Sequence, residues 1–251
     1  MRDLRRFVGL VPAAGRGTRM APYRSAKELL PVPLHKGEMP QPVILGVLKA
    51  MEHARAEGAV VVISDDKSEM VAVLGTQKPT TTPLSFVVQP SPRGLPHAIC
   101  CAAPLLADAH VLFAMPDTII SPHDALSQVR AAYESHAVDV MLGVFPTSEP
   151  ERLGPIELGP DGKVLHIHDK PGHRQFCNTW GMACWSPRFT QFCVEWEAHS
   201  QDARERVLGH VFEEARADGL KVAALMFHSG EFLDVGTPLG LAHAWREGSL
   251  P

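Results

Sequence analysis

Short apolar runs in the first half of the chain alternate with longer segments whose apolar residues recur at helical spacing. The runs that predict buried strands are residues 7–11, 59–63, 84–88, 110–115 and 138–144. The segments that predict helices are residues 42–57, 96–106 and 121–135. This alternation is typical of right-handed βαβ crossovers and of a mostly parallel sheet with helices on both faces.

The second half has a different pattern, in which short strands follow one another with turns between them. Residues 155–158, 164–168 and 178–185 predict antiparallel strands, because the turn at 159–162 and the Pro171-Gly172 break separate them. The later expected elements are a helix from Ser186-Pro187, a helix capped by Asp202 and closed by Gly219, strands at 221–227 and 231–235, and a short helix from Thr237-Pro238.

No Ser/Gly-rich linker, internal repeat or low-complexity tract divides the sequence. We therefore expect one domain over residues 1–251, with one half at about 1–145 and the other at about 146–251. The predicted fold class is α/β, a Rossmann-like three-layer sandwich around a mixed, mostly parallel central sheet. Ligands bind such sheets at the carboxyl ends of the strands, where the Gly15 loop, the 89–94 turn and Asp117 all fall.

Charge and cysteine content narrow the function classes. The chain has 24 Lys and Arg against 28 Asp and Glu, a formal charge of −4, which excludes nucleic-acid binding by bulk positive charge. The N-terminal apolar run is too short for a signal peptide, and no stretch is long enough to span a membrane. Five Cys without C-x-x-C spacing indicate a reducing compartment, so we expect a cytoplasmic protein.

The loop Gly15-Arg16-Gly17-Thr18-Arg19, with Lys27 soon after it, carries the strongest chemical signal. Glycines let backbone N–H groups approach an anion closely, and Arg19 and Lys27 add cations. Enzymes of phosphoryl and nucleotidyl transfer need such groups to position phosphates and neutralise their charge. No Gly-Lys-Ser/Thr completes a Walker A loop, and Met20 replaces the third glycine of a dinucleotide fingerprint. A plain Gly-rich turn with two solvated cations is the structural alternative.

Four blocks in order over nearly the whole chain resemble the sugar-phosphate nucleotidylyltransferases, which include the thymidylyl- and uridylyltransferases acting on glucose 1-phosphate. The blocks are residues 15–19 with 27–32, residues 89–95, residues 116–118, and residues 169–171 followed by 234–238. The resemblance implies the nucleotide-diphospho-sugar transferase type of fold. It also makes the first half nucleotide-binding and the second half sugar-phosphate-binding.

The resemblance assigns the nucleotide side. Arg19 would stabilise the departing pyrophosphate, and Lys27 would neutralise phosphate charge during transfer. Gln89 would hydrogen-bond the base edge, and Gly94 would let the base lie on bare backbone. The nucleotide-binding set that it implies is Ala13, Ala14, Gly15, Gly17, Thr18, Gln89 and Gly94.

It also implies a metal pair, Asp117 and Asp234, holding Mg²⁺. Magnesium prefers hard oxygen ligands and bridges a few carboxylates to substrate phosphates. Both Asp lie at the ends of predicted strands, far apart in sequence, and can converge above one sheet. The Met-Pro-Asp-Thr segment around Asp117 departs from the usual Gly-Asp of the family.

On the sugar side, Lys170 resembles the lysine that holds the sugar 1-phosphate, and Asp169 stands where the family usually has Glu. The sugar-phosphate set is Gly154, Asp169, Lys170, Asn178 and Thr179. His166, His168 and His173 cluster nearby; without a completing Cys or carboxylate we expect solvated or hydroxyl-contacting histidines rather than a metal site.

The implied reaction joins a nucleoside triphosphate, with dTTP or UTP favoured, to a sugar 1-phosphate by Mg²⁺-assisted in-line displacement. The alternatives are a cytidylyltransferase for a polyol, choline or other small phosphate, a non-catalytic regulatory homologue, and a NAD-binding dehydrogenase that the missing third glycine disfavours. Longer relatives carry C-terminal helices, and the chain ends soon after Pro238. We therefore expect a monomer or a homodimer.

Overall fold

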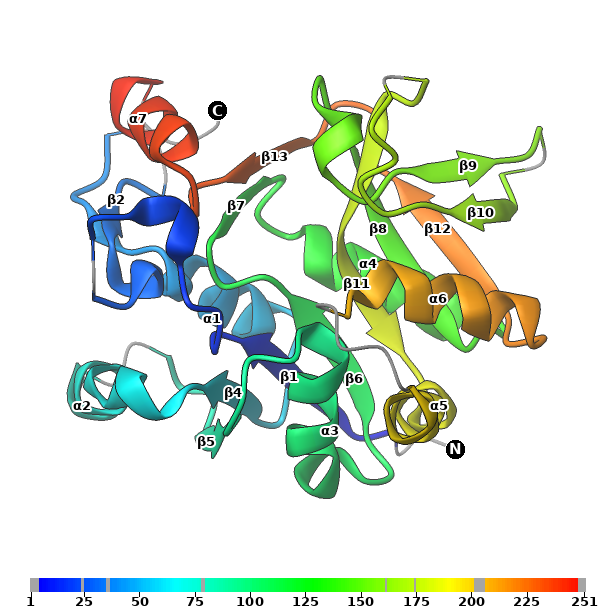
Figure 1. Cartoon of the computed structure of the whole chain (residues 1–251), viewed down its shortest axis with the longest axis horizontal. Helices are drawn as coiled ribbons and strands as arrows, with labels where there is room; N and C mark the ends of the chain where they lie inside the picture. The colour runs from blue at the N-terminus through cyan, green and yellow to red at the C-terminus, as the bar shows by residue number, and fades with distance from the viewer. Residues whose placement is uncertain are drawn as a thin grey trace.

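The computed structural model describes residues 5–23, 25–34, 37–77, 80–160, 162–173, 175–200 and 206–247. Its centre is a seven-stranded sheet (Figure 1). The strands in spatial order are β12 (Val222–Met226), β8 (Val140–Pro146), β11 (Asn178–Trp185), β6 (His110–Ala114), β1 (Phe7–Pro12), β4 (Ala59–Ile63) and β5 (Leu84–Val88). β11 runs antiparallel to β6 and β8, and the other neighbouring pairs are parallel. The predicted mixed, mostly parallel sheet is confirmed.

Helices cover both faces of this sheet. One face packs on α1 (Ile44–His53), α4 (Ala125–Ser135), and parts of α2 (Ser68–Gln77) and α7 (Pro238–Glu247). The other face packs on α3 (Leu95–Leu106), α5 (Pro187–His199) and α6 (Leu208–Ala217). The strand β1 shows why both faces need cover.

Successive side chains of a strand point to opposite faces, and in β1 both sets are apolar. Phe7 and Val11 lie in the core under α1, whereas Val8 and Leu10 lie in the core under α3. Each layer therefore buries its own apolar face, which gives the three-layer sandwich predicted from the alternating pattern.

Three two-stranded sheets stand outside the main sheet. They are β2 (Pro31–Val32) with β3 (Gln41–Pro42), β7 (Thr118–Ser121) with β13 (Glu231–Asp234), and β9 (Ile156–Leu158) with β10 (Val164–Ile167). The 3-10 turns are η1 (Thr18–Met20), η2 (Lys27–Leu29), η3 (Asp65–Lys67) and η4 (Pro150–Arg152). The antiparallel pairing predicted for β9, β10 and β11 is confirmed.

Several predicted boundaries differ from the structure. The helix α2 was not predicted; its apolar residues form one run, Met70 to Leu74, of which Met70 and Leu74 are buried and Val71 is exposed. The strand β7 was not predicted either: it ends at Ser121, where the helix over 121–135 was expected to start, and α4 begins at Ala125. The helix α6 begins at Leu208, and its expected cap Asp202 lies outside the described residues. Within the part of the chain that the structure describes, no helix is both long and apolar enough to cross a membrane.

Candidate active site

A cavity of about 920 Å³ opens at the carboxyl ends of the central strands. Residues from both halves of the chain line it. The predicted site residues in its lining are Ala14, Gly15, Gly17, Thr18, Arg19, Lys27, Gln89, Gly94, Asp117, Gly154, Asp169, Lys170, Thr179 and Asp234. Ala13 and Asn178 lie outside the lining. The cavity therefore brings the four sequence blocks to one place.

The Gly-rich loop leaves β1 at Pro12 and turns sharply at Gly17. Gly17 has φ of 63°, a left-handed conformation that favours glycine, and it begins η1. Ala13, at the start of the loop, is fixed from both sides: its amide donates to the carbonyl of Val62, and its carbonyl accepts from Lys67 Nζ at 2.7 Å. The backbone of Ala13 therefore anchors the loop to β4 and η3.

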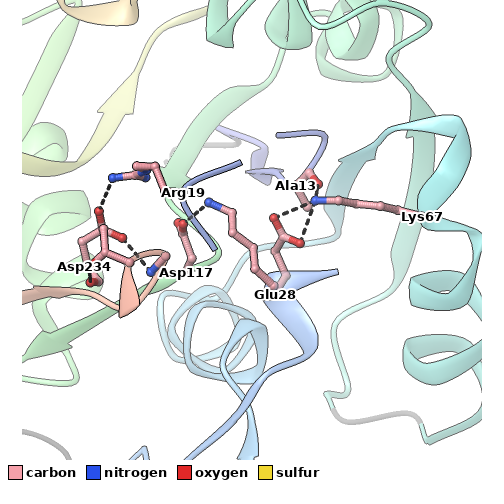
Figure 2. Close-up of polar contacts among 9 residues, drawn as sticks. Ala13, Arg19, Glu28, Lys67, Asp117 and Asp234 are labelled. Carbon is pink, nitrogen blue, oxygen red and sulfur yellow. Dashed lines mark hydrogen bonds and ion pairs between the residues drawn. The ribbon is translucent and has the colours of Figure 1, made fainter. Parts of the chain in front are cut away.

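Glu28 and Lys67 form a buried ion pair behind this loop (Figure 2). Lys67 Nζ lies 2.9 and 2.8 Å from the two Glu28 carboxylate oxygens, so the contact is bidentate. Burial raises the pKa of Glu28 above its usual range, and Lys67 partly offsets this effect. The pair shares Lys67 with the carbonyl of Ala13, so it ties η2 to the base of the Gly-rich loop.

Opposite charges also meet across the predicted catalytic centre. Lys27 Nζ makes a short contact with Asp117 Oδ2, and Arg19 Nη1 donates to Asp234 Oδ2 at 2.9 Å (Figure 2). Burial alone would lower the pKa of Lys27, but the Asp117 carboxylate outweighs it and the net pKa is raised. Lys27 is therefore positively charged beside the Asp117 carboxylate, where it can also contact a second anion.

The ladder between β7 and β13 explains how Asp117 and Asp234 come together. Asp234 pairs with Thr118 in this ladder, and the amide of Val235 donates to the carbonyl of Asp117 at 3.0 Å. The two carboxylates were expected at strand ends, able to converge above one sheet. Asp117 follows β6 of the main sheet, and Asp234 ends β13 of a separate two-stranded sheet that pairs beside it.

Gly236 leaves the room in which these charged groups meet. A Cβ atom at Gly236 would lie 2.3 Å from Asp117 Oδ2, 2.9 Å from Asp234 Oδ1 and 3.0 Å from Lys27 Nζ. Any larger residue would therefore fill the space between the carboxylates and the lysine. The amide of Gly236 also donates to Asp234 Oδ1 at 2.8 Å, which orients that carboxylate.

Gln89 and Gly94 form a corner of the cavity, and hydrogen bonds hold them in place. Gln89 Nε2 donates to the carbonyl of Gly94 at 3.1 Å and lies 3.0 Å from His97 Nδ1. Burial and the nearby charge of Arg93 lower the pKa of His97, which favours its neutral form. Gln89 is itself buried, so its amide is fixed in one orientation rather than free in solvent. We call residues 89–97 the Gln89 corner.

Of the residues predicted for the sugar side, some line the cavity, and Asn178 instead holds two strands together. Thr179 Oγ1 accepts from the amide of Gly154, and a Cβ on Gly154 would lie 2.3 Å from Trp180 Nε1. Asn178 accepts from the amide of Ile156 and donates to its carbonyl, so its side chain joins β11 to β9. The backbone amide of Lys170 donates to the carbonyl of Leu153 at 2.8 Å.

The three histidines near Lys170 have different surroundings. His166 Nδ1 lies 3.1 Å from Glu213, and His168 Nε2 lies 3.6 Å from Glu157. Across the described residues, no group of three or more His, Cys, Asp or Glu is placed to hold a metal ion. Two of these histidines therefore face carboxylates, a partner that the sequence did not reveal.

Comparison with known proteins defines the family. The family model described as nucleotidyl transferase matches residues 8–247, which is nearly the whole chain. The chain belongs to the nucleotidyl transferase family. The resemblance to sugar-phosphate nucleotidylyltransferases found in the sequence is thereby confirmed.

Curated proteins similar in sequence to this nucleotidyl transferase include two kinds of relative. A glucose-1-phosphate thymidylyltransferase of Streptomyces griseus is 30% identical over 168 residues, which cover 65% of this chain and 44% of that protein. A bifunctional protein GlmU of Cereibacter sphaeroides is 31% identical over 251 residues, covering 95% of this chain and 51% of GlmU. The chain spans about half the length of these relatives.

Solved structures confirm the fold. A UDP-glucose pyrophosphorylase complexed with UDP-glucose superposes with a TM-score of 0.78 at 19% identity, covering 95% of this chain and 97% of that one. A UDP-glucose pyrophosphorylase of Acinetobacter baumannii gives 0.75 at 20% identity, with coverage of 95% and 92%. At these identities the likeness concerns the fold alone.

The donor set of this nucleotidyl transferase suits a divalent cation. Asp117 and Asp234 offer carboxylate oxygens, the hard ligands that Mg²⁺ prefers, and Gly236 keeps the space between them open. Both carboxylates are engaged by cations of the protein, Lys27 and Arg19. The residues therefore fit a metal that arrives with an anionic substrate able to draw these cations away.

Sequence reasoning missed several residues of the site. The sequence assigns no role to Glu28, Lys67, Glu197 or Arg206. Glu28 stands beside another charged residue, Lys27, so the local pattern does not mark it as buried. The partners of Glu28 and Glu197 lie far away in sequence or in unmarked segments, so no local pattern identifies them.

Proposed function

We propose that this chain is a sugar-1-phosphate nucleotidyltransferase, which joins a nucleoside triphosphate to a sugar 1-phosphate and releases pyrophosphate. The observation that carries the proposal is the cavity in which Arg19, Lys27, Asp117 and Asp234 meet, beside Lys170 and the Gln89 corner. Thymidylyltransferase and GlmU relatives support the same reaction class. We favour dTTP or UTP as the nucleotide.

The chemistry is an in-line displacement. A phosphate oxygen of the sugar 1-phosphate attacks the α-phosphorus, a new P–O bond forms, the α–β bridging bond breaks, and the electron pair leaves with pyrophosphate. The attacking phosphate is already an anion, so no general base is needed. Positioning and charge neutralisation then carry most of the rate enhancement.

The protein residues supply those charges. Amides of the Gly15–Thr18 loop bind the triphosphate, Arg19 faces the departing pyrophosphate, and Lys27 neutralises phosphate charge. Asp117 and Asp234 would hold Mg²⁺, which when bound would supply further positive charge to the reacting phosphates. Lys170 holds the phosphate of the sugar, and Asp169, Gly154 and Thr179 shape the sugar end of the cavity.

A screen for pyrophosphate release tests the proposal. Thymidine, uridine, cytidine and guanosine triphosphates are each combined with a panel of hexose 1-phosphates, with choline phosphate and with a polyol phosphate, in the presence of Mg²⁺. We expect release with a hexose 1-phosphate and a pyrimidine triphosphate. Release with choline or polyol phosphate alone supports the cytidylyltransferase alternative, and no release with any pair contradicts transferase activity. Light scattering tests the proposed monomer or homodimer.

A further inference from the structure

Arg206 belongs to the second half of the chain, yet its main chain contacts Gly94 of the Gln89 corner. Gly94 and Arg206 form a parallel β-bridge. Gly94 has φ of 96°, and a Cβ on it would lie 2.1 Å from the Arg206 carbonyl oxygen. The two main chains therefore touch directly, with no room for a side chain at position 94.

A buried carboxylate holds Arg206 in this position. Glu197 of α5 is 6% exposed, and its Oε1 lies 2.6 Å from Arg206 Nη1, whose side chain is 9% exposed. Arg206 also donates to the carbonyls of Glu197 and Ser200, at 3.1 and 2.7 Å. Each of these contacts fixes the Arg206 side chain to the C-terminal part of α5.

The same carboxylate reaches the other strand of the bridge. Arg93, which immediately precedes Gly94, places Nη2 3.4 Å from Glu197 Oε1. Glu197 thus joins the residue before Gly94 to the residue that bridges Gly94. Together we call Arg93, Glu197 and Arg206 the Glu197 clamp. A buried ion pair adds little net stability compared with apolar packing. The position of the clamp beside Gly94, rather than its stability, therefore points to a role in the site.

The clamp positions a wall of the cavity. Arg206, Val207 and Leu208 line the cavity, as do Gln89 and Gly94 on the opposite side of the bridge. Gln89 is fixed in turn through the carbonyl of Gly94 and through His97. Displacing the 206–208 segment would therefore change both the width of the corner and the orientation of the Gln89 amide.

We propose that Glu197 is a positioning residue that sets the nucleobase selectivity of the enzyme by clamping the 206–208 segment against Gly94. The proposal rests on the proposed function, since it takes the Gln89 corner as the place of the base. The triphosphate end of the cavity is held by the independent pair of Glu28 and Lys67. Loss of the clamp therefore changes base recognition while leaving the transfer step in place.

The experiment compares Glu197→Gln, Arg206→Met and the double variant with the wild type. The readouts are kcat and KM for thymidine, uridine, cytidine and guanosine triphosphates, KM for the sugar 1-phosphate, and Tm. We expect an increase of about tenfold in KM for the preferred triphosphate and a loss of about tenfold in selectivity among the four bases. We expect kcat and the sugar KM within about twofold of wild type. The double variant should resemble the single variants, because each of the three loses the contact between Glu197 and Arg206.

Two further variants keep the test decisive. Glu213→Gln is the control, since Glu213 of α6 also pairs with an arginine, Arg216, but does not line the cavity; it should leave selectivity unchanged. If Glu197→Gln or Arg206→Met fails to fold, Arg93→Gln replaces them, because Arg93 is half exposed and its loss removes one arm of the clamp. A fall in Tm with unchanged KM and unchanged base selectivity would overturn the proposal.

Direct binding separates this proposal from the proposed function. Calorimetry measures the Kd of each of the four triphosphates for wild type and variants. If the wild type binds a triphosphate but transfers it to no acceptor, the proposed function fails, and the ratio of Kd values still decides the role of Glu197. If the wild type binds none of the four, both proposals fail.

Discussion

The catalytic centre and the Gln89 corner use charged and polar groups in opposite ways. At the centre, Arg19 is 56% exposed and pairs with Asp234, so a substrate phosphate can replace the carboxylate as its partner. In the corner, Glu197 and Arg206 are buried and bonded to groups of the protein. Charged side chains at the centre can exchange a protein partner for a substrate, whereas those in the corner keep their protein partners.

Two neighbouring residues show the same contrast within one turn of η2. Lys27 contacts Asp117, whereas the carboxylate of Glu28 pairs with Lys67 (Figure 2). The two adjacent residues have different partners, so a single short turn supplies both an exchangeable charge and a fixed one. The predictions below test this difference.

The largest effect is expected for Gly236→Ala, which places a methyl group between the exchangeable charges. The Cβ would lie 2.3 Å from Asp117 Oδ2. We expect kcat for pyrophosphate release to fall by about 10³-fold, the scale of losing one preorganised charge contact in an active site. Gly75→Ala in α2, where a Cβ meets nothing within 4 Å, is the control and should keep full activity. An active Gly236→Ala enzyme would show that the carboxylates do not need this space.

Arg19→Ala removes an exchangeable cation without removing packing. We expect kcat to fall by about 10²-fold with Tm unchanged, because the side chain is exposed and its proposed role is stabilisation of the departing pyrophosphate. Steady-state kinetics and thermal unfolding measure the two effects. Arg188→Ala removes an exposed arginine that pairs with Asp139 outside the cavity and should change neither. Turnover near the wild-type value would contradict the role of Arg19.

Lys67→Met tests a fixed charge, the lysine of η3 that pairs with Glu28 of η2. It leaves the Glu28 carboxylate buried without its cation, so we expect about 3 kcal/mol of destabilisation. Denaturant unfolding measures this loss. The double variant Lys67→Met with Glu28→Leu should recover part of it, because the buried charge is then gone. Equal stability of Lys67→Met and wild type would show that the pair is not a fixed element.

Gln89→Leu sharpens the comparison inside the corner. The substitution removes the hydrogen bonds to Gly94 and His97 while keeping most of the volume. We expect KM for the preferred triphosphate to rise about tenfold, the cost of one unmade buried hydrogen bond, with kcat little changed. Kinetics at saturating sugar 1-phosphate separate the two constants. A loss in kcat like that of Arg19→Ala would assign Gln89 to the exchangeable region instead.

The smallest effect is expected for Glu213, a fixed carboxylate that does not line the cavity. Burial would raise its pKa, but hydrogen bonds from Arg216 and the Ile167 amide lower it to about 2. A lowered pKa contributes stability above the unfolded pKa of about 4.3, and this stability is lost as pH falls toward 2. Glu213→Gln should therefore lower Tm by a few degrees, about 2 to 4 °C per kcal/mol lost, at pH 7. The difference should vanish near pH 2, and a difference independent of pH would contradict this account.

Much of the fold was predictable because it is encoded locally. Strands such as 59–63 are apolar on both faces, and their runs are visible without knowledge of their partners. The strand β7 was missed for the opposite reason. The short β7 exists because it pairs with β13, and no residue between Asp117 and Ser121 announces a partner so far along the chain.

The site divides in the same manner. Arg19, Lys27, Gln89 and Lys170 stand in motifs whose spacing is visible, and the structure gathers them at one cavity. Within the Glu197 clamp, Arg93 stands in the 89–95 block but is half exposed, and no motif marks the other two residues. Glu197 and Arg206 are ordinary charged positions until the fold buries them together, and burial is a property of tertiary packing rather than of sequence spacing.

The ladder of β7 with β13 also sets an order of events during synthesis. The strands β1, β4, β5 and β6 can pair as soon as the first half of the chain has left the ribosome, since domains assemble from the N-terminal side. Asp117 is present at that stage, but its partner Asp234 is not. The carboxylate pair closes after β13 has been made, so a nascent or truncated chain that ends before residue 234 has the Gly-rich loop without the paired carboxylates beside it.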